Sequence, residues 1–128
     1  MITGFAFTKV MVADVAGMER FYCDVMGLCV RTRIAVDHPG YAIRETVLEV
    51  AGGATLLNLV QHLDRPCPAP GEAVIGLTVS DIDAVIAACV RAGGQVKTPV
   101  TEVTEHKLKV AYIADPEGHM LELLQPLA

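Results

Sequence analysis

The order of apolar and polar residues repeats once along the chain. In each half an apolar stretch ends at an aspartate, an amphipathic segment follows, and a glycine precedes the next apolar stretch. An aspartate can cap a helix by accepting hydrogen bonds from the free amides of its first turn, and a glycine can adopt the left-handed conformation that ends it. The aspartates are Asp14 and Asp81, and the glycines are Gly27 and Gly94. The pattern therefore predicts helices at residues 15–26 and 82–92.

Three segments after each predicted helix have strand character. Apolar runs occupy residues 29–34, 41–50 and 54–61 in the first half, and 96–100, 108–114 and 120–124 in the second. Turns containing glycine or proline separate the last two strands of each half. Each half then has the order βαβββ. The sequence predicts an α+β fold of two such modules in tandem, within a single domain of 128 residues.

A proline-rich segment, "HLDRPCPAPGEA", joins the two predicted modules. Its three prolines favour an extended, stiff link and disfavour a helix or a central strand. The predicted boundaries are 1–61 for module one, 62–72 for the connector and 73–128 for module two.

Charge and composition exclude several classes of function. A net charge of −5 argues against a nucleic-acid-binding surface, and no apolar run is long enough to cross a membrane. The four cysteines lack CxxC spacing, and the first residues do not read as an export signal, so we expect reduced thiols in the cytoplasm. Neither a Ser-centred catalytic turn nor a phosphate-binding loop is present in the sequence.

Two parts of the sequence resemble the vicinal-oxygen-chelate superfamily, which includes glyoxalase I, bleomycin-resistance proteins, fosfomycin-resistance enzymes and extradiol dioxygenases. The first is "VMVADVAGMERFYCDVMGL"; the second combines "VIGLTVSDIDAVIAACVRAGG" with "YIADPEGHMLELLQ". Together they span nearly the whole chain. The resemblance implies that the curved mixed sheets of the two βαβββ modules form a cleft for a small-molecule ligand, and that the protein is a homodimer.

The resemblance also identifies four positions at which metal-using members of the superfamily place His, Glu or Gln ligands. In this chain they hold Phe7, Asn58, Val74 and Glu122. Phenylalanine and valine offer a metal no donor atoms, and a neutral asparagine is a poor ligand. We therefore expect no metal or other cofactor at this place. A divalent-metal lyase or dioxygenase with a relocated site remains an alternative, and its candidate ligands are His62 and the loop histidines His38, His106 and His119.

Strand alternation and the family's geometry predict which other side chains line the cleft. Phe5, Phe7, Lys9 and Met11 share one face of the first strand. The predicted ligand contacts are Phe7, Lys9, Asn58, Val74, Thr78 and Met120, with Glu122 as the catalytic candidate. A mainly apolar lining with a few polar groups is typical of a small-molecule site. Arg31 and Arg33 share another strand face and could bind an anionic group, but the preferred interpretation is a solvated strand edge protected by charge.

Two functions remain open for a protein of this kind that lacks a metal. In the first, the protein is a lyase or isomerase of glyoxalase type: Glu122 moves a proton next to a carbonyl group, and Lys9 or Asn58 stabilises the developing oxyanion. In the second, it sequesters a drug or metabolite without changing it. A structural role for Glu122, as the partner of Lys9 in an internal ion pair, is a further alternative.

Overall fold

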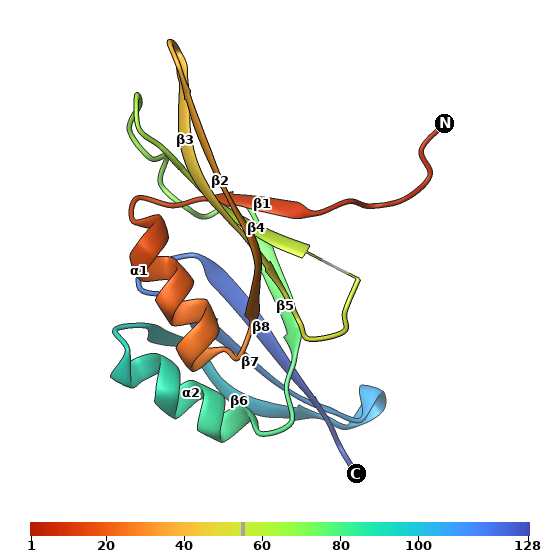
Figure 1. Ribbon diagram of the computed structural model, residues 1–128. Helices are drawn as coiled ribbons and strands as arrows, with labels where there is room; N and C mark the ends of the chain where they lie inside the picture. Colours follow the sequence, from red (N-terminus) through yellow and green to blue (C-terminus); the bar gives the residue numbers. More distant parts are fainter. Residues whose placement is uncertain (55) are drawn as a thin grey trace. The chain divides into compact units, whose positions relative to one another are not determined.

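The computed structural model describes residues 1–54 and 56–128 (Figure 1). It divides into two compact units, Met1–Pro68 and Ala69–Ala128. Each unit carries one four-stranded mixed sheet and has the order βαβββ, so the predicted fold class is confirmed. No helix among the described residues is both long and apolar enough to cross a membrane.

The first unit contains four strands and two short helical segments. In chain order these are β1 (Thr8–Met11), α1 (Val15–Arg20), η1 (Phe21–Val25), β2 (Cys29–His38), β3 (Tyr41–Glu49) and β4 (Leu56–His62). The strand order in the sheet is β1-β4-β3-β2. The pair β1–β4 is parallel and the other two pairs are antiparallel. Helix α1 packs against β3 and β4, which leaves the opposite face of the sheet to the predicted ligand contacts.

The second unit repeats this arrangement. Its elements are β5 (Val74–Thr78), α2 (Ile82–Arg91), β6 (Gln95–Val103), η2 (Thr104–His106), β7 (Leu108–Ala114) and β8 (Met120–Pro126). The strand order is β5-β8-β7-β6, again with the first pair parallel. Helix α2 packs against β6, β7 and β8. Its buried Ile82 and Cys89 contribute to a core that includes Ile113, Leu121 and Leu123.

Both α-helices begin in the same way. Asp14 and Asp81 accept hydrogen bonds from first-turn amides at 3.0 Å, as the sequence predicts. A glutamine from the last strand of each unit adds a second bond to the first helical amide: Gln61 accepts at 3.0 Å in unit 1, and Gln125 accepts at 2.7 Å in unit 2. Each helix start is therefore fixed to its own sheet, which positions the helix over the sheet.

The first predicted helix differs from the observed one in its second half. Residues 15–26 were expected to form one α-helix, but α1 ends at Arg20 and the π-helical segment η1 continues to Val25. Two consecutive aromatic residues, Phe21 and Tyr22, are both buried there, with ring centroids 5.1 Å apart in an edge-on contact. The wider π turn accompanies the burial of both rings, whereas a regular amphipathic helix turns neighbouring residues to different sides.

Three further details correct the sequence prediction. The left-handed residue after α2 is Gly93, with φ of 96°, whereas Gly94 is buried close to Cys89 and the carbonyl of Ala114, where a side chain would not fit. The first strand begins only at Thr8, so Phe5 and Phe7 precede the strand that was expected to contain them. The predicted strand 54–61 is observed as β4, which begins at Leu56, and residue 55 lies outside the described residues.

Candidate functional site

The predicted site residues occupy equivalent places in the two sheets. In unit 1, Asn58 on β4 lies opposite Lys9, two positions after Phe7. In unit 2, Glu122 on β8 lies opposite Gly76, two positions after Val74. The repeat seen in the sequence thus continues in the strand register. Each unit therefore holds one half of the predicted site residues.

The half in unit 1 is built around a buried acid, Glu45 on β3, which is 4% exposed. One oxygen of its carboxylate lies 3.2 Å from Lys9 Nζ, and the other accepts a hydrogen bond of 2.7 Å from Asn58 Nδ2. Three strands therefore contribute to one polar cluster. Burial of a carboxylate is unfavourable unless it is paired and hydrogen-bonded, and Glu45 has both kinds of partner.

Phe7 and the Asn58 carbonyl complete this cluster. The Lys9 ammonium lies 5.2 Å from the centre of the Phe7 ring, within the range of a cation–π interaction, and the ring is half-exposed. Asn58 is buried, and its Oδ1 has no hydrogen-bond partner among the described residues. The bond to Glu45 orients the amide so that this oxygen remains a buried acceptor. The cluster therefore offers an ammonium, an aromatic ring and one unused acceptor.

Glu45 is the residue that sequence reasoning missed. It lies within the predicted strand 41–50, where the alternation of polar and apolar residues predicts that an acid faces solvent. The signal that points to it is the hairpin register: Val47 pairs with Asn58 and Glu45 with Val60, so Glu45 and Asn58 are diagonal neighbours on one face. Lys9 thereby has a partner that the sequence interpretation did not consider. A pairing of Lys9 with Glu122 stays a hypothesis.

The half in unit 2 is built around Glu122, which is half-buried in the middle of β8. Tyr112 on β7 is its cross-strand neighbour. A hydrogen bond from the Tyr112 hydroxyl to Glu122 raises the pKa of the tyrosine, and burial and the negative charge of Glu122 add to this effect. The raised pKa favours the protonated phenol, which can donate a hydrogen bond to the Glu122 carboxylate.

The other side of Glu122 is open. Its neighbour on β5 is Gly76, and a Cβ atom added to that glycine would meet no atom within 4 Å. Beyond it lie the exposed Val74, paired with the half-buried Met120, and the exposed Thr78, paired with Leu124. Glu122 thus stands between a phenol on one side and accessible, mainly apolar surface on the other. An arrangement of this kind can bind a partly apolar molecule and exchange a proton with it.

Of the four residues that the resemblance places at metal positions, only Glu122 carries a strong donor, so the set does not fit a divalent cation. Phe7 and Val74 have no donor atoms, and the amide of Asn58 is bonded to Glu45 beside the Lys9 ammonium, whose charge repels a cation. In the part of the chain that the structure describes, no group of three or more His, Cys, Asp or Glu side chains could hold a metal ion.

The histidines proposed for a relocated site lie in different surroundings. His62 packs edge-on against Tyr41 at 6.2 Å between ring centroids, and its Nδ1 is buried without a hydrogen-bond partner among residues 1–54 and 56–128. His119 is buried, with Nδ1 2.9 Å from Asp115 Oδ2 in the turn before β8. His38 and His106 are exposed. The described histidines therefore do not assemble the relocated metal site.

Comparison with known proteins agrees with these observations. The sequence profile of the Glyoxalase/Bleomycin resistance protein/Dioxygenase superfamily matches residues 4–123. The chain belongs to this superfamily. No curated protein matches the sequence. Proteins of this superfamily bind small molecules.

Solved structures show the same fold at low sequence identity. A glyoxalase family protein from Bacillus cereus superimposes with a TM-score of 0.89 at 18% identity, covering 100% of this chain and 97% of that one. A glyoxalase/bleomycin resistance protein from Albidiferax ferrireducens gives 0.70 at 21% identity, covering 94% and 97%. A mutant of glyoxalase I from Zea mays gives 0.78 at 16% identity, covering 96% of this chain but 45% of that protein.

Proposed function

We propose that this protein is a superfamily member that works without a metal, binds a small, partly apolar organic molecule and transfers a proton through Glu122, as a lyase or isomerase of glyoxalase type. The observation that carries the proposal is the position of Glu122, between the Tyr112 hydroxyl and the open surface over Gly76. Val74, Thr78 and Met120 supply contacts to the apolar part of the ligand. In unit 1, Phe7, Lys9 and Asn58 remain predicted ligand contacts.

In the proposed reaction Glu122 accepts a proton from a carbon atom next to a carbonyl group. The electrons of the broken C–H bond form an enolate, and the proton returns from Glu122 to a neighbouring atom of the same intermediate. Tyr112 orients the carboxylate through its hydrogen bond. The hydrogen bond to Glu122 raises the pKa of Tyr112, so Tyr112 keeps its own proton while Glu122 is ionised.

Sequestration without chemistry is the second candidate. It is favoured by the cluster in unit 1, where Lys9 and Asn58 are bound to Glu45 and are thus occupied in stabilising a buried charge. In that function Glu122 makes an electrostatic or hydrogen-bonding contact with a ligand that leaves unchanged.

A ligand screen followed by two substitutions distinguishes the candidates. A small-molecule library is tested by thermal shift, because a specific ligand raises the melting temperature by mass action. Each hit is then incubated with the protein and analysed for product by NMR spectroscopy. In the catalytic case Glu122→Gln abolishes turnover and retains binding, while Glu102→Gln, an exposed acid on β6, changes neither. If every hit is recovered unchanged from the wild-type protein, the catalytic proposal fails and sequestration stands.

The proposed independence from metal has its own test. Purified protein is dialysed and its metal content is measured. A stoichiometric divalent metal that survives dialysis would contradict the proposal and would support a metal-dependent lyase or dioxygenase. Removal of weakly bound metal should leave ligand binding and any turnover unchanged.

We also propose that the protein forms a homodimer in the cytoplasm. Support for the dimer comes from the segment before β1, where Met1, Ile2 and Phe5 are exposed and would be covered by a partner. Light scattering during size-exclusion chromatography measures the mass directly. A monomer at all accessible concentrations would contradict the dimer.

A further inference from the structure

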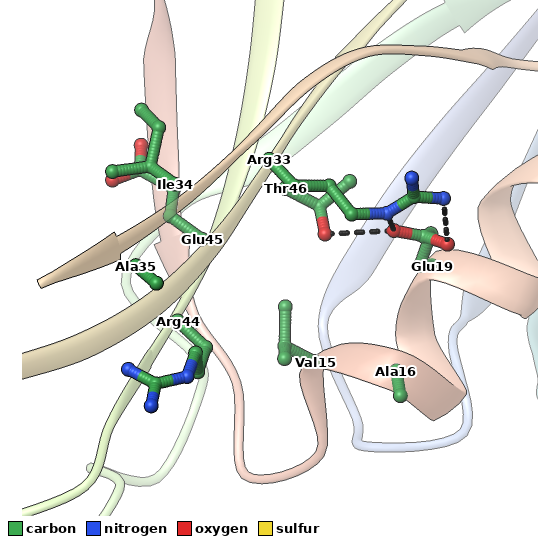
Figure 2. A pocket seen from close by; sticks show the side chains of 9 residues that line it. All are labelled: Val15, Ala16, Glu19, Arg33, Ile34, Ala35, Arg44, Glu45 and Thr46. Carbon is green, nitrogen blue, oxygen red and sulfur yellow. Dashed lines mark hydrogen bonds and ion pairs between the residues drawn. The ribbon is translucent and has the colours of Figure 1, made fainter.

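A pocket of about 300 Å³ lies in unit 1, on the helix-covered side of the sheet (Figure 2). It is formed by α1 and the hairpin of β2 and β3, and no function described above uses it. Its lining residues are Val15, Ala16, Glu19, Arg33, Ile34, Ala35, Arg44, Glu45 and Thr46. The volume is at the lower end of the range for small-molecule sites.

Strand register explains which side chains face the helix. Arg33 pairs with Thr46 and Ala35 with Arg44, so these four residues share one face of the hairpin. Ile34 and Glu45 form the pair between them, and Figure 2 shows both side chains directed away from Val15 and Ala16. The carboxylate of Glu45 is held on that opposite face by Lys9 and Asn58.

The pocket exists because small residues stand where larger ones would fill the space. Ala16 on α1 and Ala35 on β2 are exposed, and Val15 is half-buried beside them. The helix cannot easily collapse onto the sheet, since the Val15 amide is bonded to Gln61 on β4 at 3.0 Å. The walls are therefore apolar and held in place before any ligand binds.

One side of the pocket is closed by a saturated ion pair. Arg33 donates from Nε and Nη2 to the two oxygens of Glu19 at 2.8 and 2.9 Å. Thr46 donates to the same carboxylate at 2.9 Å, as the dashed lines in Figure 2 show. Glu19 accepts three hydrogen bonds and its charge is neutralised by Arg33. This side therefore offers an anion little attraction.

Arg44, on the other side, keeps unused donors. Its Nη1 donates to Asp37 Oδ1 at 3.0 Å and to the Ile43 carbonyl at 2.8 Å. Its Nε and Nη2 have no hydrogen-bond partner in the described part of the chain. These two nitrogens form one edge of the guanidinium group, the edge that binds a carboxylate in a bidentate manner. The Asp37 pair is solvent-exposed and hence weak.

We infer that this pocket binds a small monocarboxylic acid with a compact apolar body. The carboxylate accepts two hydrogen bonds from the free edge of Arg44, and the apolar body lies against Val15, Ala16 and Ala35. A bare inorganic anion would use the arginine alone, and a neutral analogue would use the apolar wall alone. Recognition requires both parts of the ligand, and it is independent of the function proposed for Glu122.

Benzoate is a suitable probe, with benzamide as its neutral counterpart and inorganic phosphate as an anion without an apolar body. Binding to the full chain is followed by amide chemical shifts in titrations of the ¹⁵N-labelled protein. We expect benzoate to shift the resonances of Val15, Ala16 and Ala35 at millimolar concentrations. Benzamide lacks the charge-assisted contact and phosphate lacks the apolar body, so each should bind at least about tenfold more weakly than benzoate.

Substitutions of both partners of the Arg44–Asp37 ion pair make the test more specific. Arg44→Gln should weaken benzoate binding about tenfold. Asp37→Asn should strengthen it, because a negative charge beside the guanidinium group is removed while Nε and Nη2 stay free. Arg31→Gln is the matched control: Arg31 is an exposed arginine on the same strand as Asp37, is paired with Glu49 and does not line the pocket. The Arg31→Gln variant should bind benzoate with the same affinity as the wild type.

Filling the pocket provides a test that does not depend on charge. Ala16→Leu places an isobutyl group on the exposed side of α1, where folding should tolerate it. Unchanged circular dichroism together with abolished benzoate shifts would support the site. Equal binding of benzoate and benzamide, equal binding by the wild type and Arg44→Gln, or shifts confined to residues outside the pocket would overturn the inference.

Discussion

Asn58 Nδ2 donates a hydrogen bond of 2.7 Å to Glu45 Oε2, while the other oxygen of this carboxylate lies 3.2 Å from Lys9 Nζ. The acid is buried, whereas the lysine is partly exposed. Asn58, which the resemblance places at a metal-ligand position, thus supports an internal ion pair. The geometry assigns to this half of the site a contribution to folding stability that can be measured separately from ligand binding.

Replacing Lys9 with methionine tests that contribution. The apolar stem is retained, but Glu45 loses the ammonium group and stays buried. Because one partner of the pair is partly exposed, the unfolding free energy should fall by about 1–3 kcal/mol, less than for a fully buried pair. Urea unfolding followed by circular dichroism measures the difference.

The matched control is Arg31→Met, which breaks the exposed pair of Arg31 and Glu49 at 3.8 Å. This change should cost less than about 1 kcal/mol. Equal losses of unfolding free energy for the two substitutions would show that the burial of Glu45 does not increase the contribution of its ion pair to stability. A double substitution of Lys9 by Met and Glu45 by Leu should recover part of the loss, because no unpaired charge is left behind.

The glutamines that cap the helices from the sheet give a second prediction. Gln61→Ala and Gln125→Ala each leave the first amide of a helix without its acceptor, so each should lower the unfolding free energy by about 1 kcal/mol. Gln95→Ala is the control, since Gln95 is exposed on β6 and bonds only Lys97 among the described contacts. A loss at Gln95 as large as that at Gln61 would contradict a specific capping role.

The sequence predicted the local features of the fold well. The aspartate caps and the order of strands depend on residues close together in the chain, and they are confirmed. The errors occur where tertiary packing decides. The π-helical turn accompanies the burial of Phe21 beside Tyr22, and Gly94 is required by the approach of Cys89. Neither contact can be read from a pattern of apolar residues.

The candidate site was predictable to the extent that it follows the repeat. The offset of 67 residues between the modules relates Phe7 to Val74, and the resemblance placed Asn58 and Glu122 on the last strand of each module. The strand registers agree, because Asn58 lies opposite Lys9 and Glu122 opposite the equivalent Gly76. Their partners, Glu45 and Tyr112, come from neighbouring strands. Which residues meet across a hairpin depends on its exact register, and a shift by one residue would turn each side chain to the other face. Sequence reasoning alone therefore could not assign these partners.

Glu19 gives a prediction for acid stability. The hydrogen bond from Arg33 lowers its pKa below the ordinary value of 4.5, partly offset by burial and assisted by Thr46. A carboxyl group whose pKa is lower in the folded than in the unfolded chain stabilises the fold at pH values above its unfolded pKa. This stabilisation is lost as the pH falls through the folded pKa. Below pH 4.5, the wild type should therefore lose stability more steeply than Glu19→Gln.

The size of the acid effect should be about 0.5–1 kcal/mol, because Arg33 is largely exposed and solvent screens the pair. Unfolding free energies are measured by urea denaturation from neutral pH down to the acid limit of folding. Glu102→Gln, which removes an exposed acid from β6, should follow the wild-type curve. Parallel curves for wild type and Glu19→Gln would contradict the assignment.

The pair in unit 2 gives the last prediction. The hydrogen bond to Glu122, together with burial and the negative charge of the acid, raises the pKa of Tyr112 above its ordinary value of 10.0. Loss of the phenolic proton would place two negative charges side by side, so neutralising the acid should make that loss easier. Glu122→Gln should therefore lower the pKa of Tyr112 toward 10.0.

Absorbance of the ionised phenol follows this titration, and Tyr112→Phe identifies its share among the three tyrosines of the chain. Glu102→Gln on β6 should leave the curve unchanged. If Glu122→Gln titrates like the wild type, the two side chains do not form the pair on which the proposed proton transfer depends. If the shift is observed, the same titration with a bound ligand reports whether that ligand displaces Tyr112 from the carboxylate. Displacement would raise the absorbance at lower pH, because the phenol would lose its acceptor and its neighbouring charge together.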